Sequence, residues 1–254
     1  MEGLFLKENA MKNLSLLLML MSLVPFSACN IGQTAQEDIT EQVLLSENKT
    51  NSEMSSAVPE TSEKVSTVSS FATEEFLLPF DDYSWEMTNK PEYVMLHFTS
   101  AAVPHPEDPF NLEYVREIFK DNFVSIHYII DRDGKIHCWL PETRAAWHAG
   151  KGTFNNDDKL TNSMNKYSIG IEMLAIGSEN DIAQYLTSEQ SKLLDDSFKG
   201  YTDEQYQSLK LLVADICQRN GIPQDSEHII GHEMYNPAKN DPGELFDWSR
   251  LFAQ

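Results

Sequence analysis

The sequence predicts an α/β domain over residues 75–254, with a central mixed β-sheet flanked by helices. Apolar runs with the composition of buried strands alternate along this part of the chain with segments of helical periodicity. Turn and capping residues separate the two kinds of segment. Hydrophobic residues make up 41% of the 254 residues and aromatic residues 10%, which is enough for a core and excludes a wholly disordered chain.

The predicted strands are short and apolar. Residues 93–99 (YVMLHFT) and 168–174 (SIGIEML) form nearly continuous apolar runs, as expected for strands that are buried on both faces. Residues 124–130 and 135–140 are predicted to pair, because Asp131–Gly134 between them has the sequence of a hairpin turn.

Two helices and one further strand complete the predicted domain. Residues 108–120 begin with an Asp-Pro pair, which is typical of a helix N-cap and first turn. Residues 202–205 have the sequence of a capping box and open a second helix, which ends at the Asn-Gly pair 220–221. A short strand is then predicted within residues 225–232, running into a loop.

Residues 1–28 have the pattern of an export signal. Lys12 precedes an apolar run over 14–28, which is shorter than the roughly 20 residues of a membrane-spanning helix. The sequence FSAC, which ends at Cys29, resembles the lipobox of bacterial lipoproteins, in which the cysteine is lipidated and becomes the mature N-terminus. A plain secretory signal is the alternative. The residues before Met11 do not resemble the basic start of a signal, so Met11 is an alternative first residue.

Residues 29–74 are predicted to be a flexible, acidic linker, because they are rich in Ser and Thr and follow neither a helical nor a strand period. The whole chain carries a formal charge of −21, from 40 acidic and 19 basic residues. Such a chain is unsuited to binding nucleic-acid phosphates or anionic head groups. We therefore expect no nucleic-acid partner, and contact with a membrane only through an N-terminal lipid.

The seven histidines all lie in the predicted domain. His232 and Glu233 begin like the zinc-protease motif H-E-x-x-H, but Asn236 occupies its fifth position, which excludes that motif. Histidine and aspartate are good zinc ligands, and a catalytic zinc site needs three protein ligands. His232 and Asp241, in an Asp-Pro-Gly sequence, supply two candidates, and the third has to come from elsewhere in the chain.

The order of the motifs resembles that of the type 2 N-acetylmuramoyl-L-alanine amidases. GH at 231–232, P.K.DPG at 237–243 and FDW at 246–248 are preceded by AWHAG and SIGIE. Those zinc enzymes cleave the amide between N-acetylmuramic acid and L-alanine in peptidoglycan, and they share their fold with the peptidoglycan recognition proteins. The resemblance extends from Leu96 to Trp248. It implies Zn²⁺ as the cofactor and peptidoglycan or a muropeptide as the substrate.

The resemblance also assigns the site residues. It implies three metal ligands, which are His97, His232 and Asp241. Glu172 in SIGIE is expected to act as general base and acid, Lys239 to stabilise the oxyanion, and His148 in AWHAG to contact the substrate. The four histidines without a matching motif position are predicted to be structural or surface residues: His105, His127, His137 and His228.

Other interpretations stay open. A binding module of the same fold would hold peptidoglycan without cutting it, and a zinc peptidase of another class would act on an unrelated substrate. The complete ligand set together with Glu172 favours the amidase, because binding modules of this fold commonly lack a metal ligand. Cys138 and Cys217 are predicted to be core residues, and whether they pair stays open.

The predicted lipidation assigns all membrane affinity to residue 29, because an acidic domain is repelled by anionic head groups. We expect Cys29→Ser to move the exported protein from the membrane fraction to the soluble fraction, with unchanged specific activity on soluble muropeptides. Fractionation followed by immunoblotting checks this, with Ser56→Ala in the linker as the control. A serine variant that stays with the membrane would contradict the assignment.

Overall fold

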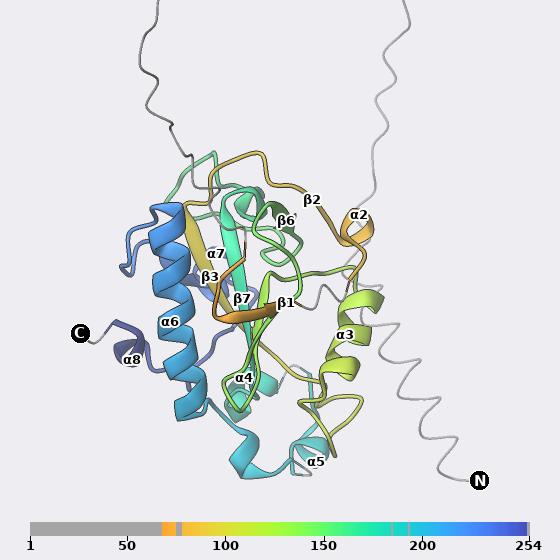
Figure 1. The fold of residues 1–254 in the computed structure, drawn as a ribbon. Helices are drawn as coiled ribbons and strands as arrows, with labels where there is room; N and C mark the ends of the chain where they lie inside the picture. Colours follow the sequence, from red (N-terminus) through yellow and green to blue (C-terminus); the bar gives the residue numbers. More distant parts are fainter. Residues whose placement is uncertain (1–67, 75–77, 184, 193, 253–254) are drawn as a thin grey trace, which may run out of the picture. The chain divides into compact units, whose positions relative to one another are not determined.

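The computed structural model describes residues 68–252, except 75–77, 184 and 193 (Figure 1). The predicted export signal, Cys29 and the linker as far as residue 67 lie outside the described residues. Within the described part of the chain, no helix is both long and apolar enough to cross a membrane.

A six-stranded mixed sheet forms the centre of the domain, in the order β1-β5-β4-β7-β3-β8. Its strands are β1 (Ala72–Glu74), β3 (Tyr93–Thr99), β4 (Tyr128–Ile130), β5 (Ile136–Cys138), β7 (Ser168–Leu174) and β8 (Ile229–Gly231). β4 and β5 pair antiparallel through the predicted hairpin, and the other neighbours in the sheet pair parallel. A separate antiparallel sheet joins β2 (Ser84–Glu86) to β6 (Arg144–Ala146).

The long helix α6 (Asp203–Asn220) covers one face of the six-stranded sheet. Its buried residues Leu209 and Val213 pack in one cluster with Val94 of β3 and Ile171 of β7. The predicted capping box is confirmed, since the Thr202 side chain accepts a hydrogen bond from the N–H of Gln205. The helix ends, as predicted, before a left-handed glycine at 221.

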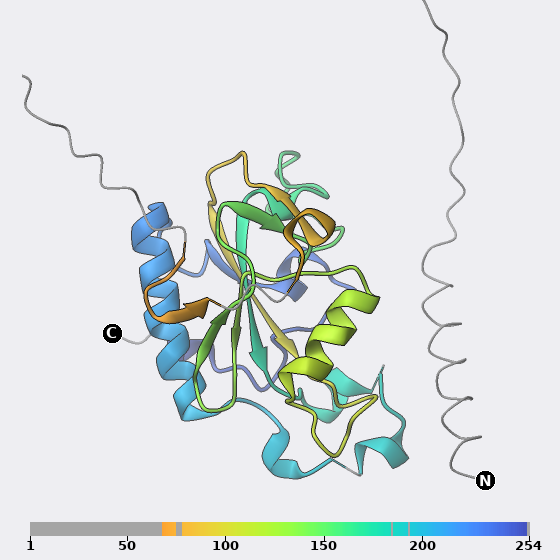
Figure 2. The ribbon, with the colours of Figure 1, turned by 45° about the vertical axis from the view of Figure 1, so that its right-hand side comes forward.

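Helix α3 (Leu112–Asp121) covers the opposite face, and Figure 2 shows α6 and α3 on either side of the strands. Phe119 of α3 packs with Ile129, whereas the next residue in the strand, Tyr128, belongs to the α6 cluster. This alternation follows from the pleat of a strand, in which successive side chains point to opposite faces.

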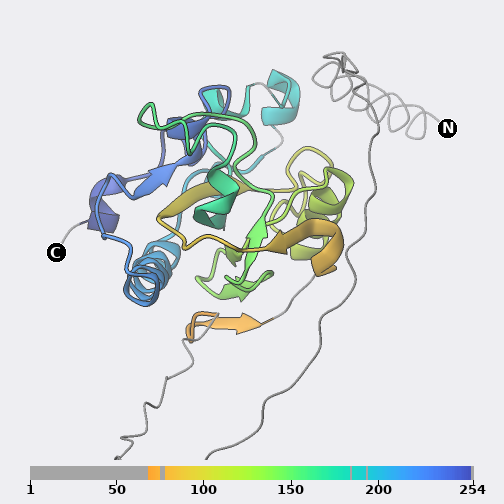
Figure 3. The same cartoon turned by 90° about the horizontal axis from the view of Figure 1, so that it is seen from above.

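Short helices connect the longer elements. They are α2 (Phe80–Tyr83), α4 (Glu179–Ile182), α5 (Ser188–Ser191), α7 (His232–Tyr235) and α8 (Trp248–Phe252), with 3₁₀ turns at Met164–Lys166 and Asp196–Phe198. Figure 1 shows α4 close to the carboxyl ends of β3 and β7. In the view from above, α6 and α7 lie on opposite sides of the sheet (Figure 3). The fold is therefore the predicted one, with helices on both faces of a mixed sheet.

Helix α3 begins later than the sequence predicts. Asn111 caps α3, because its side-chain oxygen accepts a hydrogen bond from the N–H of Glu113 at 3.0 Å. The carboxylate of Asp108 accepts instead from the side-chain amide of Asn111 at 2.9 Å, so the Asp-Pro pair belongs to a turn that precedes the helix.

The folded domain begins before residue 75, where the sequence places the end of the linker. β1 pairs with β5 at the edge of the sheet, and Val68 and Ser69 are buried. A three-residue edge strand with an exposed side shows no hydrophobic alternation, so its Ser- and Thr-rich surroundings conceal it in the sequence.

A buried carboxylate links the end of α6 to the sheet. Glu142 accepts two hydrogen bonds from the guanidinium of Arg219, at 2.6 and 2.8 Å, and one from the hydroxyl of Tyr128 at 2.6 Å. The Tyr128 hydroxyl in turn accepts from the N–H of Ser69 at 3.0 Å. This network therefore fastens the first described residues to the core.

We expect Glu142→Ala to lower the free energy of unfolding by about 2–3 kcal/mol, because it removes the buried carboxylate that Arg219 and Tyr128 both contact, while Arg219 keeps its ion pair with Asp215 at 2.8 Å. Glu113→Ala is the matched control: it removes a carboxylate that also binds an arginine, Arg116, but 65% of the Glu113 side chain is exposed, against 5% for Glu142. That change should reduce stability by about 1 kcal/mol or less. Urea unfolding measures both values, and equal losses would contradict a stabilising role for the network.

Candidate functional site

Three predicted metal ligands converge on the face of the sheet opposite α6. His97 is the fifth residue of β3, His232 follows β8 directly, and Asp241 lies in the loop after α7. Since β3 and β8 pair in parallel with Leu96 opposite Gly231, the next residue of each chain segment is a histidine. Asp241 Oδ2 lies 2.8 Å from Nδ1 of His97 and 3.0 Å from Nδ1 of His232, and these two nitrogens are 3.1 Å apart.

This donor set fits a small divalent cation. A tetrahedral zinc ion with bonds of about 2.0–2.1 Å to nitrogen and oxygen sets its ligand atoms about 3.3 Å apart. The three atoms here form a triangle only slightly smaller than that, and together they are the one group in the described part of the chain with the spacing of a metal site. Two imidazoles and one carboxylate are a donor set typical of zinc.

The second ring nitrogen of His232 has a partner that fixes the imidazole tautomer. Its Nε2 lies 3.0 Å from the carbonyl oxygen of Ala149, which can only accept. Nε2 therefore carries the hydrogen, and Nδ1 presents a lone pair to the site.

A chain of hydrogen bonds fixes His97 in the same way. Its Nε2 lies 2.9 Å from Nδ1 of His148, whose Nε2 lies 3.1 Å from the hydroxyl of Ser168. That hydroxyl donates its hydrogen to the carbonyl of Met164 at 2.8 Å, so it can only accept from Nε2 of His148. Nδ1 of His148 is therefore left with a lone pair that accepts a hydrogen bond. His97 Nε2 then donates to His148, and His97 Nδ1 is left with a lone pair for a metal.

His148 therefore orients a ligand in this structure, and both of its ring nitrogens are engaged by protein groups. Asn165 holds its backbone in place, accepting hydrogen bonds from the N–H groups of His148 and Ala149 at 3.2 and 2.8 Å. The predicted contact between His148 and substrate stays a prediction.

The electrostatics of the cluster favour a cation. Burial, followed by the neighbouring His232, lowers the pKa of His97 to about 4, so its imidazole is neutral at pH 7. Burial also acts to raise the pKa of Asp241, but the hydrogen bonds to His232 and His97 outweigh it and hold that pKa below its usual value. The site thus presents an ionised carboxylate and a neutral imidazole with its lone pair available.

Glu172 lies beside His97, because the two residues are register partners in the parallel pair β3–β7. Side chains at such positions point to the same face of a sheet. Glu172 Oε2 is buried and has no hydrogen-bond partner among the described residues. Burial, and then the charge of Asp241, raise the pKa of this carboxyl well above its ordinary value, while Lys239 acts in the opposite direction. A carboxyl in this state holds a proton strongly enough to exchange it with a reacting group.

Lys239 is exposed and close enough for its positive charge to act on both Glu172 and His97. The structure therefore brings the predicted base, the predicted oxyanion donor and the three predicted ligands to one place.

Two further contacts hold the Asp241 loop, and no pattern in the sequence predicts them. The Tyr201 hydroxyl donates to the backbone carbonyl of Pro242 at 2.5 Å. The N–H of Glu233 donates to the backbone carbonyl of Asp241 at 3.1 Å.

The remaining histidines have partners outside the cluster. His127 is buried, and its ring bonds the carbonyl of Arg144 and the N–H of Gly170. The other three lie elsewhere in the fold: His137 beside Asp131, His228 beside Asp225 and His105 stacked on Tyr114.

Both described cysteines, Cys138 and Cys217, are free thiols buried in the core, so they do not pair with each other.

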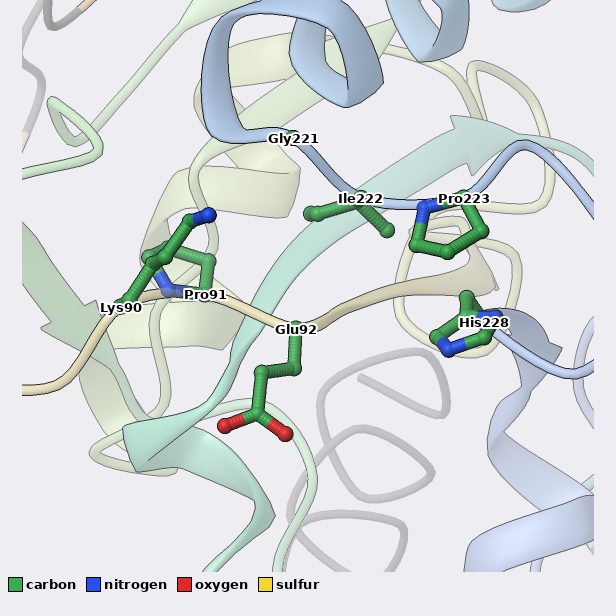
Figure 4. A pocket seen from close by; sticks show the side chains of 7 residues that line it. All are labelled: Lys90, Pro91, Glu92, Gly221, Ile222, Pro223 and His228. Atoms are coloured by element: carbon green, nitrogen blue, oxygen red, sulfur yellow. The ribbon is translucent and has the colours of Figure 1, made fainter.

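A small surface hollow of about 120 Å³ is separate from the metal cluster (Figure 4). It is lined by Lys90, Pro91, Glu92, Gly221, Ile222, Pro223 and His228. The side chain of Glu92 points away from Gly221 and Pro223 in Figure 4, and its carboxylate pairs with Lys159 at 2.7 Å. The hollow lies at the start of β3, about 16 Å along the strand from His97.

Comparison with known proteins gives consistent results. Residues 87–244 match the family model described as N-acetylmuramoyl-L-alanine amidase. The chain is 33% identical over 131 residues to the 1,6-anhydro-N-acetylmuramyl-L-alanine amidase AmpD of Citrobacter freundii, covering 51% of this chain and 56% of that protein. It is 31% identical over 142 residues to the N-acetylmuramoyl-L-alanine amidase AmiD of Escherichia coli (strain K12), covering 53% of this chain and 45% of that protein.

The fold is also similar to a solved structure, a crystal structure of a selenomethionine derivative of AmpD. The TM-score is 0.53 at 26% sequence identity, and the match covers 73% of this chain and 95% of that chain. The chain spans about half the length of the curated relatives it matches. Because the family model spans more than half of this chain and includes His97, Glu172, His232 and Asp241, the chain belongs to the N-acetylmuramoyl-L-alanine amidase family.

Proposed function

We propose that this protein is a zinc-dependent amidase, which hydrolyses the bond between the lactyl group of N-acetylmuramic acid and L-alanine in peptidoglycan or muropeptides. The observation that carries the proposal is the convergence of two imidazoles and one carboxylate beside Glu172, whose Oε2 is buried. The names of the relatives support the substrate class: AmpD is named for 1,6-anhydro-N-acetylmuramyl-L-alanine and AmiD for N-acetylmuramoyl-L-alanine.

The residues of the site have distinct roles in this reaction. His97, His232 and Asp241 would hold Zn²⁺, which when bound supplies a Lewis acid that polarises the amide carbonyl and makes water more acidic. The oxygen of the attacking water bonds to the carbonyl carbon, and Glu172 takes a proton from that water. The same carboxyl then gives the proton to the nitrogen of L-alanine as the carbon–nitrogen bond breaks. Lys239 offers its ammonium to the negative charge that develops on the carbonyl oxygen.

A peptidoglycan-binding module without activity is the second candidate function. Such a module needs neither a proton acceptor nor a complete ligand set. The raised pKa of Glu172 and its buried, unpartnered Oε2 are unfavourable for a residue that only packs, since a buried polar atom without a hydrogen bond destabilises a fold. These features favour catalysis.

We also propose that the protein acts in the cell envelope as an exported lipoprotein anchored through Cys29. The lipobox-like sequence before Cys29 and the acidic residues that follow it support this placement. It would bring the domain close to peptidoglycan, with the membrane contacted only by the lipid.

The metal assignment predicts one Zn²⁺ per chain. We expect His232→Ala to lose most of this zinc, because a site with two ligands binds the ion far more weakly than a site with three. Elemental analysis after dialysis checks this. His228→Ala is the control, since that histidine pairs with Asp225 at the protein surface and should leave the zinc content unchanged. Full zinc retention by His232→Ala would rule out the assigned site.

The proposed base has a test that separates chemistry from metal binding. Glu172→Gln keeps the size of the side chain but removes the proton acceptor, so the cleavage rate should fall by about 10²–10⁴-fold. Zinc content and melting temperature should stay close to those of the wild type. A Gln variant that cleaves muropeptides at nearly the wild-type rate would show that the base lies elsewhere.

A further inference from the structure

We infer that Asp181, in α4, is a positioning residue for the metal centre: it holds in place the loop that carries Asp241. The inference rests on the proposed zinc site and adds a residue that contacts neither the metal nor the substrate. α4 follows β7 in the chain, and Figure 1 shows it close to the carboxyl ends of β3 and β7.

Asp181 binds the loop on both sides of the ligand. Its backbone carbonyl accepts a hydrogen bond from the side-chain amide of Asn240 at 2.8 Å, one residue before Asp241. Its Oδ2 accepts from the N–H of Glu244 at 3.3 Å, three residues after Asp241. The same oxygen accepts from the N–H of Ser178 at 2.8 Å, which fixes the carboxylate relative to its own helix.

The Asp181 carboxylate fits between the start of α4 and the Asp241 loop because each of these segments has a glycine next to it, Gly177 before α4 and Gly243 in the loop. A Cβ atom at Gly177 would lie 2.5 Å from Cβ of Asp181, and one at Gly243 would lie 2.7 Å from its Oδ2. Gly243 also has a φ of +83°, which disfavours any other residue. Asp181 is only 3% exposed, so its carboxylate is enclosed between α4 and the loop.

Exposed contacts extend the same junction. The carboxylate of Glu244 accepts hydrogen bonds from the hydroxyl of Ser178 at 2.9 Å and from the side-chain amide of Asn180 at 3.2 Å. These side chains are open to water, so each contact contributes little by itself. The buried Asp181 is therefore the member whose loss should release the loop.

A released loop still carries Asp241, but it no longer holds the carboxylate beside the two histidines before a metal arrives. Zinc binding must then also order the loop, and the free energy of that ordering is taken from the binding free energy. Changes to groups that orient metal ligands typically reduce metal affinity by about 10–100-fold. We expect a loss of this size when Asp181 is removed.

The test measures zinc binding alone, by competition with a chromophoric chelator against the full chain. Asp181→Ala should raise the Kd for Zn²⁺ by about 10–100-fold. Asp181→Asn keeps an oxygen that can accept from the same N–H groups and should recover most of the affinity. Glu179→Ala is the control in the same helix: 80% of the Glu179 side chain is exposed and it contacts Lys199 at 3.5 Å, so its Kd should match that of the wild type.

A second variant makes the test independent of one substitution. Asn240→Ala removes the hydrogen bond to the Asp181 carbonyl and should also weaken zinc binding, by about threefold or more. Asn240→Ala replaces Asp181→Ala in the test if the latter variant does not fold, as judged by circular dichroism of the metal-free protein. A folded Asp181→Ala, or otherwise Asn240→Ala, with the wild-type Kd would overturn the inference. Absence of zinc binding by the wild type would instead overturn the proposed function.

Discussion

The parallel pairing of β3 with β7 on one side and β8 on the other is the constraint on which the site depends. It sets His97 level with Glu172 and brings His232 to the end of the neighbouring strand. Strand pairing fixes these positions through main-chain hydrogen bonds, and a shift of one residue would turn each side chain to the opposite face. The ligands on β3 and next to β8, together with the base, are therefore positioned by strand pairing in the central sheet, whereas Asp241 and Lys239 depend on a loop.

Burying so many polar groups is possible because nearly all of them are hydrogen-bonded. The chain from His97 through His148 and Ser168 ends on a backbone carbonyl, and His232 donates to the carbonyl of Ala149. These bonds fix the tautomers of the imidazoles and aim their lone pairs at the ligand position. Among the described residues, Glu172 and Glu233 beside the ligands each keep one buried oxygen without a hydrogen-bond partner, and Glu172 is the one level with His97 in the sheet, where a proton acceptor is needed.

The parts of the fold that could be predicted from sequence are those encoded by neighbouring residues. Both seven-residue strands occupy the ranges predicted from their apolar composition, and the capping box at Thr202 and the glycine at 221 bound α6 as predicted. β1 and the β2–β6 pair were missed, because short edge strands have no period and depend on distant partners. The metal ligands were found through motif order, whereas the contact of Asp181 with the Asp241 loop joins residues that are far apart in the chain and follows no local pattern.

The central claim is that this domain cleaves one particular amide with the help of a metal. The most direct measurement incubates the purified protein with a defined muropeptide, with and without chelator, and identifies the products by mass spectrometry. The account predicts an intact muramyl sugar and a peptide with a free N-terminal L-alanine, no cleavage after chelation, and recovery when zinc is restored. An uncut muropeptide, cleavage within the peptide stem, or unchanged cleavage in the presence of chelator would contradict it.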